Sequence, residues 1–284
     1  MRIANVSGRL TLLTSDERGI DVARASDGRF GADPQAIYDR WDEFTQWTAT
    51  VDTGGAAAFG PEDLRPPAPA PRQILAIGLN YRSHAAESGF ATPDDQPVVF
   101  TKFASCLTGR RGDIALPPGG HTDWEVELVA VIGRPARQVS VDDGWSHVAG
   151  LAAGQDVSER ISQLAGPAPQ FSMGKSFPGF GPVGPWLVTP DEFADPDDLE
   201  LGCAINGEEV QKGRTRDLIF SVPLLVASLS RTVTLLPGDV IFTGTPAGVG
   251  MGRDPQRWLR PGDELVTWIE GIGEMCHRFV AAAG

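Results

Sequence analysis

The chain has 284 residues, 41% of them hydrophobic, and a formal net charge of −13 at pH 7. This length suffices for one large domain with a small addition, and the negative charge argues against nucleic acid or an anionic membrane as a partner. Because no apolar stretch approaches the length of a membrane span and the first residues lack a secretion signal, we expect a cytoplasmic protein. The odd, scattered cysteines (Cys106, Cys203 and Cys276) agree with a reducing compartment.

The first part of the chain differs in character from the rest. Residues 1–68 alternate short apolar runs with acidic loops and contain one helix-like segment, AIYDRWDEFTQW (36–47), which together predict a small N-terminal α+β domain. The Pro- and Ala-rich stretch 61–73 suits neither a helix interior nor a central strand. We therefore predict a second, catalytic domain over residues 69–284.

From residue 74 onward, short β-branched runs alternate with Gly and Pro, which is typical of strands. Strands are predicted over 74–81, 97–103, 127–133, 184–189, 199–207, 239–244 and 263–273, and helices over 141–150 and 219–231. Many strands and few helices indicate a mixed α/β, mostly β, fold. The GxGxxG match at 179–184 is not a dinucleotide fingerprint, because Pro182 and Pro185 interrupt it and a strand follows instead of a helix.

Three carboxylates have the spacing of ligands to one hard cation. Glu125 and Glu127 stand two apart where the strand 127–133 begins, so their side chains point to one face, and Asp156 follows the small-residue run 148–154. Ionised carboxylates inside a sheet repel one another and lose hydration, so they need a cation or a shared proton. Oxygen ligands favour Mg²⁺ or Mn²⁺ over Zn²⁺. A solvated strand end with two surface glutamates is the alternative interpretation.

Two further features allow a functional and a purely structural interpretation. His84 and Glu87 are three residues apart, so on a helix the carboxylate can orient the imidazole, unless both are surface residues. Lys175 lies in an otherwise neutral Gly/Pro/Phe segment, where it faces either solvent or an anion.

The same holds for two segments near the predicted strand ends. If the segment is helical, the spacing of Asp156, Arg160 and Gln163 places them on one face, which is either functional or solvated. The Gly-rich turn 244–248, which contains Thr245, either cradles an oxyanion or carboxylate with its amides or is only a tight turn.

Taken together, these segments resemble the fumarylacetoacetate hydrolase (FAH) family. The resemblance spans roughly residues 72–283 and rests on motifs in the family's order: ILAIGLNYRSHAAE, TDWEVELVAVIG, GQDVS, GKSFPGFGPVGPWLVTPDE, NGEEVQKGRTRDLIFSV, LLPGDVIFTGTPAGVG and LRPGDELVTWIEGIG. It implies an FAH-type catalytic β-roll or sandwich behind a variable N-terminal domain. Gln155 departs from the more usual Asn-Asp pair, which is expected to alter the environment that orients Asp156.

The resemblance also implies a site and a homodimer. By this match, the metal ligands for Mg²⁺ or Mn²⁺ are Glu125, Glu127 and Asp156, the catalytic residues are His84, Glu87 and Lys175, and the residues that contact substrate or support the metal are Arg160, Gln163 and Thr245. The implied substrate is a small anionic 1,3-diketo acid, such as an acylpyruvate or fumarylpyruvate. Water activated by His84 and Glu87 would cleave a C–C bond through a metal-stabilised enolate.

Other activities use the same site in this family. Decarboxylation of an oxaloacetate-type β-keto acid and isomerisation of a hydroxymuconate-like diene also pass through an enolate, so the ligand set does not separate them. An intact His84–Glu87 pair favours hydrolysis, because decarboxylation needs no activated water. A binding protein that kept the fold without catalysis is the remote alternative.

Overall fold

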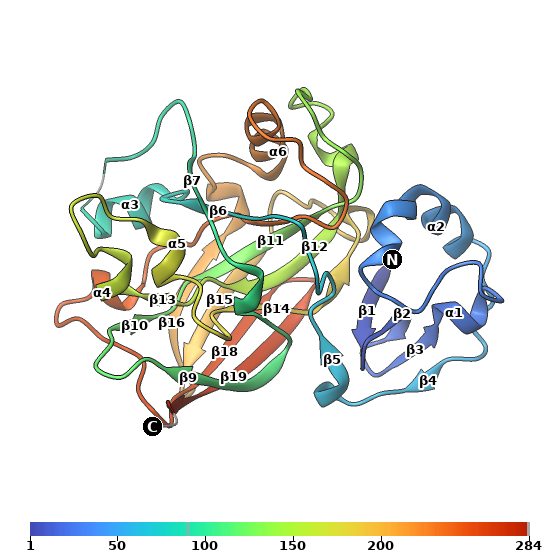
Figure 1. The fold of residues 1–284 in the computed structure, drawn as a ribbon, viewed down its shortest axis with the longest axis horizontal. Helices are drawn as coiled ribbons and strands as arrows, with labels where there is room; N and C mark the ends of the chain where they lie inside the picture. Colours follow the sequence, from blue (N-terminus) through green and yellow to red (C-terminus); the bar gives the residue numbers. More distant parts are fainter. Residues whose placement is uncertain (90, 283–284) are drawn as a thin grey trace.

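Figure 1 shows the chain in a computed structural model, which describes residues 1–89 and 91–282. The strands are β1 (Arg2–Val6), β2 (Arg9–Ser15), β3 (Arg18–Asp21), β4 (Ala57–Ala58), β5 (Leu64–Arg65), β6 (Ile74–Gly78), β7 (Val98–Thr101), β8 (Leu107–Thr108), β9 (Arg111–Leu116), β10 (Thr122–Asp123), β11 (Val126–Ile132), β12 (Val148–Gln155), β13 (Ser158–Glu159), β14 (Gly181–Val188), β15 (Glu200–Ile205), β16 (Glu208–Arg214), β17 (Val240–Phe242), β18 (Glu264–Ile269) and β19 (Gly273–Ala281). The α-helices are α1 (Val22–Ala25), α2 (Trp41–Thr48), α3 (Arg82–Glu87), α4 (Arg160–Gln163), α5 (Phe171–Gly174) and α6 (Val222–Ser230). Short 3₁₀ turns cover Ala36–Arg40, Pro61–Asp63, Ala104–Cys106, Gly144–His147, Pro190–Glu192, Thr215–Asp217 and Gly250–Gly252.

Two sheets pack face to face and confirm the mostly β class. The larger has the strand order β4-β3-β2-β1-β14-β12-β11-β17-β6-β7, with β5 beside β1 and β8 beside β14, and the smaller has the order β16-β15-β18-β19-β9. Strands β11, β12 and β14 contact β15, β18 and β19 across the interface. No helix in the described part of the chain is long and apolar enough to cross a membrane.

Strand β11 is buried on both faces, which explains why every residue in it except Glu127 is apolar. Leu128 and Ala130 belong to the core between the sheets, whereas Val129 and Val131 belong to a second core on the opposite face. This alternation confirms the predicted period of two residues along the strand. It places Glu127 on the face opposite Leu128, where it joins Glu125.

The N-terminal region continues the larger sheet, because β1 pairs antiparallel with β14 through Ile3 opposite Leu187. In Figure 1 this region lies on the side of the molecule away from α3, α4 and α5. The segment predicted to be helical, 36–47, divides into the 3₁₀ turn Ala36–Arg40 and helix α2, whose Phe44 is fully buried in the second core. The division between residues 68 and 69 remains a prediction.

The predicted helix over 141–150 is wrong. Only the 3₁₀ turn Gly144–His147 is helical, and residues from Val148 onward form β12 between β11 and β14. At Gly144 a Cβ atom would lie 2.5 Å from the Cα atom of Pro223, so helix α6 packs directly on this turn. Strand pairing on both sides of β12 outweighs the local helical pattern, because the local sequence carries no information about these neighbouring strands.

Candidate active site

One edge of the larger sheet brings together chain segments that are far apart in sequence. β11 runs antiparallel to β12 and β17, and β17 runs parallel to β6. The start of β11 therefore lies beside the ends of β12, β17 and β6. These ends lead to the predicted metal ligands, to the turn 244–248 and to helix α3.

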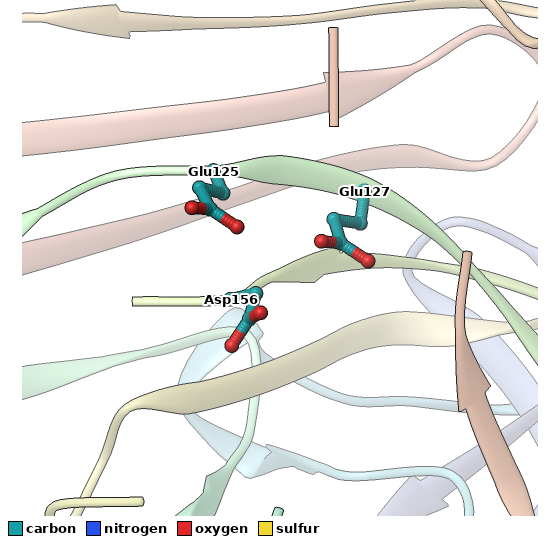
Figure 2. Close-up of side chains that lie close together, drawn as sticks. All are labelled: Glu125, Glu127 and Asp156. Carbon is teal, nitrogen blue, oxygen red and sulfur yellow. The ribbon is translucent and has the colours of Figure 1, made fainter. Parts of the chain in front are cut away.

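Three buried carboxylates meet at this edge. Figure 2 shows Glu125 and Glu127 side by side along one segment of the backbone. Asp156 faces them from the neighbouring segment of the same chain. One oxygen of each can be chosen so that all three atoms lie within 4.8 Å of one another. The exposed fractions are 5% for Glu125, 1% for Glu127 and 0% for Asp156, so the alternative of a solvated strand end does not apply.

Cations surround two of these carboxylates. The Nζ atom of Lys175 lies 2.8 Å from Oε2 of Glu125 and 2.6 Å from Oδ2 of Asp156, and Nη1 of Arg160 lies 2.7 Å from Oε1 of Glu125. Lys175 thus faces anions and not solvent. Lys102, which the sequence analysis did not select, donates from Nζ to Oδ1 of Asp156 at 2.6 Å and to the carbonyl oxygen of Lys175.

The carboxylates differ in how well their charge is compensated. Burial raises the pKa of Glu125, but the charges of Lys175 and Arg160 outweigh it and hold that pKa at about 2. Burial and the charges of Asp156 and Glu125 together raise the pKa of Glu127 well above its usual value. Glu127 accepts a hydrogen bond from the amide of Gly244 at 2.7 Å. Three carboxylates supply only oxygen ligands, and the negative charge of Glu127 is poorly compensated by the protein. Both features fit a hard divalent cation.

Helix α3 carries the predicted dyad. Nδ1 of His84 lies 2.8 Å from Oε1 of Glu87, and the amide of Gly248 donates to Oε2 of Glu87 at 2.9 Å. A Cβ atom at Gly252 would lie 2.9 Å from the same oxygen, so the chain after β17 packs closely on Glu87. The turn amides of Gly244 and Gly248 thus bind carboxylates of the protein itself, one in the triad and one in the dyad.

A buried acid anchors the segment around Arg160. The Oδ2 atom of Asp123 accepts hydrogen bonds from Nε and Nη2 of Arg160 and from the amide of Met251, and its Oδ1 atom accepts from the amides of Gly250 and Trp124. Asp123 stands two residues before Glu125, and this proximity was the only sequence signal for it. Asp156 does not share a helical face with Arg160 and Gln163, because only Arg160–Gln163 is helical. Oε1 of Gln163 nevertheless accepts from Nη1 of Arg160 at 2.9 Å.

Two buried glutamines tie the site to the smaller sheet. Oε1 of Gln155 accepts from the amide of Glu125 at 3.0 Å, and its Nε2 donates to Oγ1 of Thr267. Nε2 of Gln211 donates to Oγ1 of Thr245 at 2.8 Å. Gln155 therefore holds the backbone of Glu125, whereas the sequence analysis expected it to act on Asp156.

A pocket with about 30 Å³ of free volume opens onto these groups, room for one or two water molecules. Its lining includes residues from the predicted catalytic, substrate-contacting and metal-binding sets: His84, Glu125, Arg160, Gln163, Lys175 and Thr245. The remaining predicted residues, Glu87, Glu127 and Asp156, lie behind them through the contacts described above. The roles assigned to these nine side chains remain predictions, but the fold gathers all of them around one pocket.

Comparison with known proteins identifies the family. The family model described as fumarylacetoacetate (FAA) hydrolase, C-terminal, matches residues 73–280. This chain belongs to the fumarylacetoacetate hydrolase family. The motifs that carried the resemblance are therefore confirmed, and so is the FAH-type fold.

Relatives of this FAH-family chain differ in activity. It is 41% identical over 215 residues to the human mitochondrial oxaloacetate tautomerase FAHD2A. The aligned segment covers 75% of this chain and 68% of the human protein. The crystal structure of an HpcE candidate from Mycobacterium smegmatis is 56% identical, with a TM-score of 0.95 and complete coverage of both chains. The maleylpyruvate hydrolase from Sphingobium sp. SYK-6, solved with manganese(II) and pyruvate, is 29% identical, with a TM-score of 0.80 and complete coverage of both chains. The chain is thus an enzyme of the hydrolase or isomerase type found in this family.

Proposed function

We propose that this enzyme hydrolyses a C–C bond in a 1,3-diketo acid of the acylpyruvate type, with Mg²⁺ or Mn²⁺ as its cofactor. The observation that carries the proposal is that His84 and Glu125 line the same pocket, with Glu87 bound to His84 and with Glu127 and Asp156 grouped with Glu125 behind the lining. The related maleylpyruvate hydrolase solved with manganese(II) and pyruvate supports the choice of cofactor and substrate class.

The triad would hold the cation, which when bound polarises the carbonyl oxygens of the substrate. The chain's own residues fix the ligands: Lys175 bridges Glu125 and Asp156, and Gly244 orients Glu127. Because Lys175 and Arg160 are buried and positively charged, they offset the negative charge of Glu125 and Asp156.

His84 would act as the general base. Its Nδ1 is engaged by Glu87, which leaves Nε2 to take a proton from water as the water oxygen attacks the acyl carbonyl carbon. The bond from that carbon to the methylene carbon breaks, and its electron pair stays on the methylene carbon, which then takes up a proton. The products are a carboxylate and pyruvate. Because the amide of Gly248 fixes Glu87, the imidazole is held in one orientation.

Tautomerisation or isomerisation is the second candidate, supported by the identity to the human oxaloacetate tautomerase. It uses the same polarised carbonyl and proton transfer, but no water is consumed. Decarboxylation of a β-keto acid and binding without catalysis are further outcomes that the assay below separates.

We further propose a homodimer in the cytoplasm that acts on a small anionic substrate, without nucleic acid or membrane partners. The exposed apolar residues Val98, Val99 and Phe103, in and just beyond the edge strand β7, offer a surface for a second copy. The cysteines are all unpaired, which suits a reducing compartment.

The test is one assay with acetylpyruvate, fumarylpyruvate and oxaloacetate, with Mn²⁺ or Mg²⁺ and with chelator. We expect chelator-sensitive release of pyruvate and a carboxylic acid without CO₂. Glu125→Ala should abolish turnover and metal binding, whereas the exposed Glu209→Ala serves as control. His84→Asn should slow hydrolysis by about 100-fold or more but keep metal binding. Full activity of Glu125→Ala, or turnover of oxaloacetate alone, would refute the proposal.

A further inference from the structure

The pocket has an apolar side that the proposed chemistry does not use. Ile77 and Leu79 at the end of β6, Phe100 of β7, Phe171 of α5 and Met251 of the turn 250–252 all line it. The rings of Phe100 and Phe171 pack edge to face, with centroids 5.6 Å apart and planes inclined by 67°. This packing fixes the two rings in place.

Leu79 is held toward this wall at an energetic cost. Its φ of +58° lies in the left-handed region, which is strained for a residue other than glycine. The neighbouring Asn80 maintains the turn, because its Nδ2 donates to the carbonyl oxygens of Phe220 and Thr243, and its Oδ1 accepts from the amide of Phe220. Glycine would relax the backbone here but would remove the apolar side chain from the pocket.

The cations in the pocket lining are held by carboxylates of the protein, although Nζ of Lys175 also lies 5.1 Å from the centroid of the Phe100 ring. Within residues 1–89 and 91–282, the basic side chains that line the pocket are His84, Arg160 and Lys175. Each already faces a carboxylate of the protein at 2.8 Å or less. A second substrate carboxylate against the apolar wall would therefore find no unpaired cation.

Ser88 adds a neutral polar group to the lining. Its Oγ atom is buried and has no hydrogen-bond partner among the described residues. A hydroxyl can donate one hydrogen bond to an uncharged oxygen, but it does not compensate a full negative charge.

We propose that this pocket selects diketo acids whose acyl group is uncharged and apolar, and that it rejects diketo diacids. The proposal rests on the hydrolase function proposed above and specifies its substrate class. The free energy of an alkyl chain falls when it leaves water and packs against Phe, Leu, Ile and Met side chains. A carboxylate in the same place loses its hydration without a counterion.

The matched pair of substrates is butanoylpyruvate and succinylpyruvate, which have equal numbers of carbon atoms and differ by a terminal methyl against a terminal carboxylate. Steady-state release of pyruvate with Mn²⁺ gives kcat/KM for each. We expect the ratio to favour butanoylpyruvate by about 100-fold or more, the factor for an uncompensated buried charge. A ratio near one, or a preference for succinylpyruvate, would overturn the inference and leave the hydrolase function intact. Cleavage of neither would overturn the proposed function itself.

A cation placed in the wall should reverse the selection. Met251→Lys is expected to shift the ratio of kcat/KM values toward succinylpyruvate by about 10-fold or more. Met173→Lys is the matched control, because Met173 is 67% exposed and does not line the pocket. A ratio that stays the same in both variants would show that the wall does not set the selectivity.

Discussion

Asp123→Asn removes one carboxylate oxygen from a residue that accepts five hydrogen bonds from buried or partly buried donors. If the remaining oxygen keeps the bonds from Arg160 and Met251, the new amide group faces the N–H groups of Gly250 and Trp124. Two donors then lose their acceptor, at about 1–3 kcal/mol each, and Arg160 loses one of its two ionic partners while it keeps Glu125. The sum should approach the cost of breaking a buried ion pair, about 3–5 kcal/mol.

Urea unfolding in the presence of chelator measures this loss, and the exposed Asp113→Asn on β9 is the matched control. Because Arg160 and Met251 both line the pocket, the KM of the variant should also rise while the metal affinity changes little. A loss of unfolding free energy below about 1 kcal/mol, no greater than in the control, would refute the argument that Asp123 anchors this side of the site.

Three further outcomes are expected. Burial lowers the pKa of His277 from 6.5 to about 4, although the carbonyl of Gly109 opposes this, so below pH 6.5 only the unfolded chain takes up the proton. The free energy of unfolding should therefore fall by about 3 kcal/mol between pH 6.5 and 4, and this fall should be absent from the His277→Phe variant. If urea unfolding gives the same pH dependence for both proteins, the expectation is contradicted. Lys102→Met leaves Asp156 short of a donor and should cost about 3–5 kcal/mol in chelator, far more than the control Lys212→Met at a half-exposed site. Gly174→Ala would place a Cβ atom 2.5 Å from the amide nitrogen of Gln163 and should raise the KM by displacing α4, whereas Gly31→Ala, which has open space around it, should leave it unchanged.

Several features of the site followed from local sequence alone. The two-residue spacing of Glu125 and Glu127 defines their common face on any extended strand, and the three-residue spacing of His84 and Glu87 defines a contact on any helix. The chain order of motifs was sufficient to predict the family and the fold class, both of which are confirmed.

The sequence did not reveal groups that join the site across long separations. Lys102 lies 54 residues from Asp156 along the chain, yet they share a hydrogen bond, and nothing in the run PVVFTKF distinguishes this lysine from a surface residue. The same limit produced the wrong helix over 141–150, since local propensity says nothing about the strands that flank β12.

The sequence by itself therefore determined the chemical types and local spacing of the candidate site residues and the family to which the chain belongs. The tertiary structure alone decided which charges compensate which. The antiparallel and parallel pairing of β12, β11, β17 and β6 places four chain segments at one sheet edge. Charge interactions depend on distance in space and on burial, and both are set by strand pairing and not by position along the chain.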